Sequence, residues 1–180
     1  MRKFFATATA MVFVLFWSFT LNGFAAELKT GDKAADFSLR DSTGKGYSLY
    51  APEFQGKVLT VFYVDPAAKD LNHHAEEVLL KDTELAGHVY YKGVIISNLK
   101  ASKIPVFLVK SAIKDKTQKT GVLILLDDDY KILRLWGLKN HTSSLVVLDK
   151  DRVCRYIHNG KLSRADVENV RKMINEYLVK

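Results

Sequence analysis

The chain has 180 residues, of which 48% are apolar, and it carries a formal net charge of +7. This length suits one domain that buries its own core, and a single cysteine excludes any internal disulfide. The basic residues are spread too evenly to indicate a nucleic-acid-binding protein, so we expect no nucleic-acid partner.

The first 25 residues have the layout of a secretory signal peptide. Arg2 and Lys3 form a basic start, an apolar run follows from Ala6 to Phe19, and small residues come after it. We therefore predict a signal peptide over residues 1–25, a mature domain over residues 26–180, and a periplasmic location. Removing Arg2 and Lys3 from the 27 basic residues leaves 25 against 20 acidic ones, a net charge of +5.

The cleavage position follows from the small residues. Cleavage after Ala25 leaves Gly23 and Ala25 in the two small positions, whereas cleavage after Ala26 would put Phe24 in one of them. An uncleaved membrane anchor is the alternative, because residues 4–26 are nearly long enough to span a bilayer. Polar residues near the end of the run favour removal, so we expect no stable membrane insertion of the mature protein.

Beyond residue 26 the hydrophobic pattern predicts alternating strands and helices, with no linker or repeat. In the first half of the chain we expect two short strands within Asp36–Tyr50, a strand at Val58–Val64, a helix at Asp70–Leu85 and a strand at Lys92–Ser97. A helix at Pro105–Lys116, a strand at Gly121–Leu126 and a short helix at Tyr130–Trp136 should follow. The chain should close with a hairpin of Ser144–Asp149 with Arg152–His158 and a final helix capped by Ser163 and Asp166. This order predicts an α/β fold with a mixed sheet.

Lysines are concentrated in one segment. Lys100–Lys119 contains six lysines and one acid, Asp115. A solvated surface helix is the main interpretation, and an anionic partner or a membrane surface is the alternative.

Two stretches resemble known families. The opening "TGDKAADFSLRDSTGKGYSL" (Thr30–Leu49) resembles the start of peroxiredoxins and TlpA-like proteins. Leu125–Leu178 is similar to the YtfJ family of exported thioredoxin-like bacterial proteins, through the Trp136 segment, "SSLVVLDKD", "NGKLS" and the final helix. The resemblance implies a thioredoxin-like three-layer sandwich, with a mixed β-sheet and helices on both faces.

The same resemblance locates a degenerate active site. Aligning "VLTVFYVDPAAKDL" with the thioredoxin strand and turn puts Ala67 and Asp70 where two redox cysteines would stand, and Ser143 where a cis-proline would face them. Thiol exchange needs a thiolate and a second thiol to resolve the mixed disulfide. The resemblance therefore implies the fold without its usual reaction. A groove for an extended peptide would lie between the turn that starts at Asp65 and the Ser143–Ser144 segment.

Other chemistry-bearing residues have plainer interpretations. Cys154 alternates with Tyr156 and His158, which suggests one strand face, but Cys154 and His158 would be ~13 Å apart along the strand and cannot form a catalytic pair. His73 and His74 are adjacent, so they point about 100° apart on a helix and do not form a chelating pair. We expect no structural metal.

The triplet Asp127–Asp129 lies between a strand and a short helix. Its carboxylates could bind a cation or transfer protons. The more common role of acids at this position is to cap the helix N-terminus, and this is our prediction.

Together these features predict a non-redox binding or interaction module of the cell envelope, with a protein or peptide partner and no cofactor. We expect it not to be an enzyme. The alternative is a divergent thiol–disulfide oxidoreductase or peroxidase that uses Cys154.

The N-terminal pattern makes a direct prediction about processing. The exported protein should begin at Ala26 or Glu27 and be recovered from the periplasm without detergent. N-terminal sequencing of material isolated from cells decides this, and an intact Met1 in the membrane fraction would contradict it.

Overall fold

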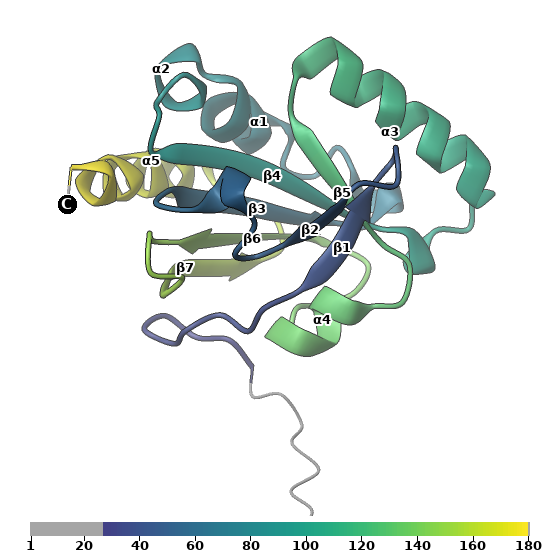
Figure 1. Cartoon of the computed structure of the whole chain (residues 1–180), viewed down its shortest axis with the longest axis horizontal. Helices are drawn as coiled ribbons and strands as arrows, with labels where there is room; N and C mark the ends of the chain where they lie inside the picture. Colours follow the sequence, from purple (N-terminus) through teal and green to yellow (C-terminus); the bar gives the residue numbers. More distant parts are fainter. Residues whose placement is uncertain (1–26, 180) are drawn as a thin grey trace, which may run out of the picture.

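A mixed seven-stranded sheet organises the part of the chain that the computed structural model describes, residues 27–179 (Figure 1). The predicted signal peptide lies outside this range. The strands are β1 (Ser38–Asp41), β2 (Gly46–Ser48), β3 (Val58–Val64), β4 (Tyr91–Asn98), β5 (Leu123–Asp127), β6 (Ser143–Leu148) and β7 (Cys154–Asn159). The helices are α1 (His73–Glu76), α2 (Thr83–Ala86), α3 (Val106–Thr120), α4 (Lys131–Trp136) and α5 (Arg164–Leu178).

The strand order across the sheet is β2-β1-β5-β4-β3-β6-β7. The central strands β3, β4 and β5 are parallel, whereas β1, β2, β6 and β7 pair antiparallel with their neighbours. This confirms the predicted mixed sheet. The segments that follow β3, β4 and β5 leave the same edge of the sheet, because the carboxyl ends of parallel strands meet there.

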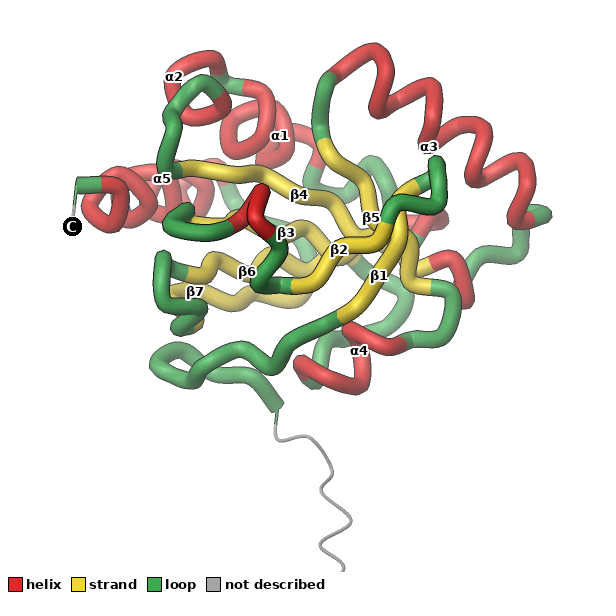
Figure 2. Tube along the Cα trace, in the orientation of Figure 1, coloured by secondary structure: helices red, strands yellow, loops and turns green. Residues whose placement is uncertain are grey.

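Apolar layers cover both faces of the sheet. On one face, the residues that α1, α3 and α5 bury include Ala75, Val109 and Ile174. On the other face lie α4, with Ile132 and Trp136, and the segment before β1. Figure 2 shows α4 on the side of the sheet opposite α1 and α3. Within residues 27–179, none of the helices combines the length and the apolar composition needed to cross a bilayer.

The predicted helix at Asp70–Leu85 is wrong as a single element. The chain forms the short helix α1, then a π-helical turn at Glu77–Lys81, and then the separate helix α2. Asn72 is not helical, because its buried side chain bonds the carbonyl of Gly160 and the amide of Leu162. Asp82 interrupts the helix with an extended backbone, and its carboxylate accepts from two amides of α2.

The long helices follow the local signals more closely. Helix α5 has the predicted capping box, in which Ser163 and Asp166 satisfy each other's backbone amides. Helix α3 begins one residue later than predicted, because Pro105 is its extended N-cap. It ends only at Thr120, where Gly121 adopts a left-handed conformation that suits glycine.

A buried arginine joins the β6–β7 turn to the segment before β3. The guanidinium of Arg152 donates to the carbonyl oxygens of Leu49 at 3.1 Å, Lys57 at 2.9 Å and Asp149 at 3.1 Å, and also to Phe54. Burial lowers the pKa of Arg152 from its usual value. These bonds satisfy carbonyls that have no strand partner.

Replacing Arg152→Met keeps most of the side-chain length and removes every donor. We expect the free energy of unfolding in urea to fall by about 3 kcal/mol, because the carbonyls of Leu49 and Lys57 lose their charged donor, whereas those of Phe54 and Asp149 keep a backbone donor. Arg164→Met is the matched control, since Arg164 is exposed on α5, and it should change stability by less than about 0.5 kcal/mol. Equal losses in the two variants would contradict this role.

Candidate functional site

The turn after β3 is built on a buried carboxylate. Asp65 is 1% exposed, and its Oδ1 accepts from the Ala67 amide at 2.8 Å. Its own amide donates to the carbonyl of Thr142 at 3.0 Å, which joins the turn to the residue before β6. Pro66 opens a single 3-10 turn that ends at Ala68. The side chain of Asp65 therefore fixes the backbone at the position of the expected redox turn.

The two positions aligned with redox cysteines carry no reactive group. Ala67 is exposed at the turn. The carboxylate of Asp70 is also exposed and pairs with Lys69 Nζ at 2.8 Å, and this bond lowers the pKa of Asp70. Neither side chain can form a covalent bond to a thiol.

The structure separates the two predicted serines. Ser143 lies beside Val64 in the sheet, and its Oγ is buried with no hydrogen-bond partner among residues 27–179. Ser144 points to the opposite face, because successive strand residues alternate, and its Oγ donates to Asn159 at 2.6 Å. All peptide bonds of the described residues are trans. Asp65 and Ala67 therefore form one local group at the turn, and neither serine side chain hydrogen-bonds to it.

His141 is a member of this group that the sequence did not indicate. It lies in the loop before β6 with a left-handed backbone (φ 55°), and its Nδ1 is 3.1 Å from Asp65 Oδ2. Since a carboxylate only accepts, Nδ1 carries the hydrogen of this bond. The ring is 73% exposed, and its Nε2 lies 3.4 Å from Nδ2 of the exposed Asn140, so this contact is open to solvent. A buried carboxylate thus orients an exposed imidazole, which can bond a polar group of a ligand.

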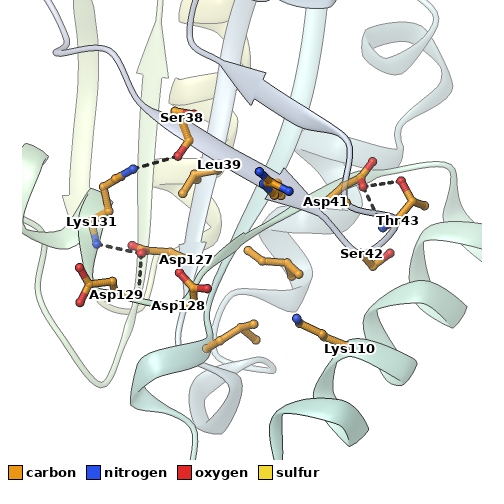
Figure 3. Close-up of a pocket in the computed structure, with 14 residues that line it drawn as sticks. Ser38, Leu39, Asp41, Ser42, Thr43, Lys110, Asp127, Asp128, Asp129 and Lys131 are labelled. Carbon is orange, nitrogen blue, oxygen red and sulfur yellow. Dashed lines mark hydrogen bonds between the residues drawn. The ribbon is translucent and has the colours of Figure 1, made fainter.

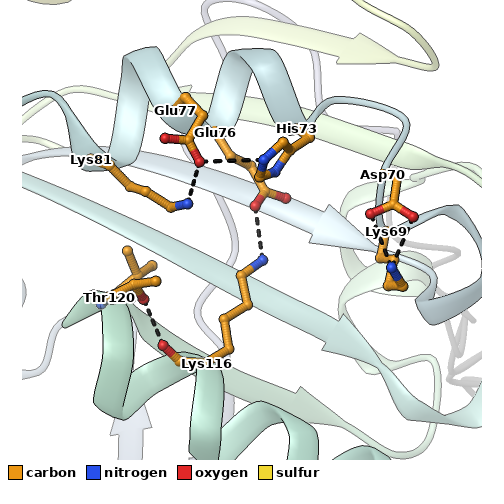
Figure 4. Close-up of polar contacts among 9 residues, drawn as sticks. Lys69, Asp70, His73, Glu76, Glu77, Lys81, Lys116 and Thr120 are labelled. Carbon is orange, nitrogen blue, oxygen red and sulfur yellow. Dashed lines mark hydrogen bonds and ion pairs between the residues drawn. The ribbon is translucent and has the colours of Figure 1, made fainter.

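An apolar cavity of about 290 Å³ adjoins the turn on the side of α3. Pro66 and Lys69 border it, and its walls are mostly apolar side chains of β3, β4, β5 and α3. The buried Glu76 of α1 lines it and pairs with Lys116 of α3 at 2.9 Å (Figure 4). Because Pro66 and Lys69 belong to the turn, the cavity adjoins it, although Asp65 and His141 are not among the lining residues.

The acidic triplet has a structural role, as predicted. The buried Asp127 accepts from the amides of Lys131 at 2.8 Å and Ile132 at 2.9 Å, which caps α4, and from the Tyr63 hydroxyl at 3.2 Å. Burial and the Asp127 charge raise the pKa of Tyr63. Asp129 pairs with Arg134 at 3.0 Å.

Figure 3 shows this triplet at one side of a polar cavity of about 680 Å³ that also adjoins the β1–β2 turn. The Asp127 carboxylate already accepts hydrogen bonds from two backbone amides, and Asp129 pairs with Arg134. The triplet therefore does not offer the cavity a group of unpaired carboxylates.

The adjacent histidines diverge. His73 Nε2 is 3.4 Å from Glu77 at the surface (Figure 4), whereas His74 Nε2 is 3.1 Å from the carbonyl of Leu162. No group of three or more His, Cys, Asp or Glu side chains within residues 27–179 is arranged to hold a metal ion.

Cys154 lies in the core under α4. It is 0% exposed, its Sγ donates to the Tyr156 carbonyl at 3.4 Å, and burial raises its pKa to about 11. The expectation that Cys154, Tyr156 and His158 share a strand face is wrong for Cys154, whereas the rings of Tyr156 and His158 stack with their centroids 6.5 Å apart. The register shift opposite Val147 and Leu148 places Cys154 in the core on the α4 side, while Tyr156 packs on the α5 side.

Sequence comparisons identify relatives of unknown function. Residues 40–177 match a family model described as "Bacterial protein of unknown function (YtfJ_HI0045)". An uncharacterized protein from Haemophilus influenzae is 29% identical over 130 residues, which cover 68% of each chain.

Structural comparisons establish the fold. The pneumococcal exposed lipoprotein thioredoxin Etrx1 from Streptococcus pneumoniae has a TM-score of 0.61 at 17% identity, over 79% of this chain and 99% of that one. Peroxidoxin BcpB from Mycobacterium tuberculosis has a TM-score of 0.59 at 21% identity, over 85% and 97% of the two chains. At these identities the similarity concerns the fold alone, and it confirms the predicted thioredoxin-like architecture.

Burial makes a prediction for Cys154. With a pKa near 11, only about 0.1% of the thiol is ionised at pH 8, and the sulfur is not accessible. Native protein should react with an aromatic disulfide reagent roughly 100-fold more slowly than urea-unfolded protein. Ala67→Cys in a Cys154→Ser background is the matched control, because its thiol would be exposed and should react at once. Comparable rates for native Cys154 and this control would contradict the prediction.

Proposed function

The chain belongs to the YtfJ_HI0045 family of bacterial proteins, as its carboxyl-terminal half predicts, and we propose that it is a binding protein of the cell envelope without thiol–disulfide exchange activity. The observation that carries this proposal is the chemistry of the turn after β3. Thiol exchange would need a thiolate at position 67, but this position carries the exposed Ala67. The backbone amide of Ala67 donates to the carboxylate of Asp65.

The proposed ligand is a protein or peptide segment that covers the turn. His141 would hydrogen-bond a polar group of the segment, and Asp65 would keep the imidazole in place. The 290 Å³ cavity beside Pro66 and Lys69 would accept one apolar side chain. A rigid polar group next to an apolar cavity is a common arrangement in ligand sites.

The alternative, an oxidoreductase that uses Cys154, requires the sulfur to reach a partner's disulfide. Burial of Cys154 and its raised pKa both oppose such an attack. No described residue provides a second thiol, since the whole chain contains one cysteine. We therefore favour the binding function.

A photo-crosslinking amino acid at position 67 tests the proposal in intact cells. We expect a discrete adduct to an envelope protein, because position 67 is exposed at the centre of the proposed site. His141→Ala should reduce the adduct about fivefold, the effect of losing one ligand hydrogen bond. The same amino acid at Glu168, which is exposed on α5, is the control and should give no such adduct.

The oxidoreductase alternative is tested with purified protein. Purified protein should not accelerate the reduction of insulin by dithiothreitol. Adducts of equal yield at positions 67 and 168 would refute the binding site, and insulin reduction that disappears in Cys154→Ser would establish the alternative.

A further inference from the structure

Exposed apolar side chains surround the start of α3. Ile104, Val106, Phe107 and Leu108, which we call the α3 tip, are each about half exposed or more, and Phe107 is 71% exposed. Single exposed apolar residues are ordinary, but a contiguous group marks a surface that contacts something else. The tip lies at the outer edge of the molecule, on the right in Figure 1.

Unpaired lysines flank the tip on both sides. Lys100 and Lys103 precede it, and Lys110 and Lys114 follow it; all four are exposed. None of the four ammonium groups forms a hydrogen bond or an ion pair with another residue in the range 27–179. Asp115 is the one acid in this segment. The surface is therefore apolar at its centre with lysines around it. Asp128 and Asp129 lie on one side of it, in the polar cavity that Lys110 also lines. The excess of lysines over acids complements an anionic surface.

The arrangement of the apolar residues favours a lipid surface over a protein groove. Successive residues of a helix are about 100° apart, so Val106, Phe107 and Leu108 point in directions that span more than half of the helix circumference. A protein that packs on one helix face would leave part of this group exposed. A bilayer interface surrounds a helix end and contacts all of it.

We propose that the α3 tip docks the protein peripherally on an anionic phospholipid bilayer. Phe107 enters the interfacial layer, and the lysines contact the lipid phosphates. Lys110 and Lys114 follow Phe107 by about 4.5 and 10.5 Å along the helix. At these separations the long, flexible lysine side chains can bring their charged ends to the lipid phosphates while Phe107 is in the interfacial layer.

This docking goes beyond the proposed binding function and does not depend on it. Val106 and Phe107 do not line the cavity beside the turn, whereas Ile104 and Leu108 do. Changes at Phe107 therefore separate the two sites.

Vesicle flotation of the mature protein tests the proposal. We expect binding to vesicles of phosphatidylcholine and phosphatidylglycerol in a 2:1 ratio, no binding to phosphatidylcholine alone, and weaker binding at high salt. Phe107→Ser should weaken binding about tenfold, and Lys103→Gln and Lys110→Gln about fivefold each. Phe107→Trp should shift its fluorescence to shorter wavelength only with the anionic vesicles.

Val89→Ser is the matched control, because Val89 is 66% exposed but precedes β4 and so lies at its opposite end. It should leave vesicle binding unchanged, and Phe107→Ser should leave the adduct at position 67 unchanged. Absence of binding to anionic vesicles at low salt would overturn the proposal, as would equal losses in Phe107→Ser and Val89→Ser. Self-association that Phe107→Ser abolishes, without vesicle binding, would assign the tip to a second copy of the chain instead.

Discussion

Burial of β3 on both faces is the constraint on which the remaining structure depends. All seven residues of the strand are buried, between the parallel β4 and the antiparallel β6. Phe62 and Val64 enter the core under α1, α3 and α5, and Val61 and Tyr63 enter the core on the α4 side. A strand held in two cores cannot shift its register without exposing one set of side chains. Its carboxyl end is therefore a fixed point.

Asp65 leaves this fixed point while still buried, and a buried carboxylate requires hydrogen-bond partners. It finds them in the Ala67 amide and in the ring of His141. The turn that the resemblance aligns with a redox turn thus has no sulfur at positions 67 and 70, and the buried carboxylate of Asp65 fixes its backbone instead. The turn after β3 therefore presents hydrogen-bonded polar groups and no reactive sulfur, which is why we interpret it as a binding site.

The turn site and the α3 tip are neighbouring surfaces with different chemistry. Both lie at the edge of the sheet where β3, β4 and β5 end, and the cavity walls include Ile104 and Leu108 from the tip. The turn offers one oriented imidazole and one apolar cavity, whereas the tip offers exposed apolar side chains and unpaired lysines. A protein held at a membrane by the tip would present the turn to partners near that membrane.

The sequence by itself determined the features whose signals lie within a few residues. These include the buried run of β3, which the local hydrophobic pattern encodes, and the capping box of α5, which the capping residues encode. The absence of thiols at the turn follows directly from the residue identities.

Only the tertiary structure decided the features that depend on distant partners. The helix expected at Asp70–Leu85 is interrupted because Asn72 bonds residues 88 and 90 positions away. A bulge turned Cys154 from the face shared by its neighbours. His141 reached the site only because Asp65, 76 positions earlier, lies beside it in the fold. Hydrogen bonds between such distant residues leave no local periodicity, so no pattern in the sequence could have indicated them.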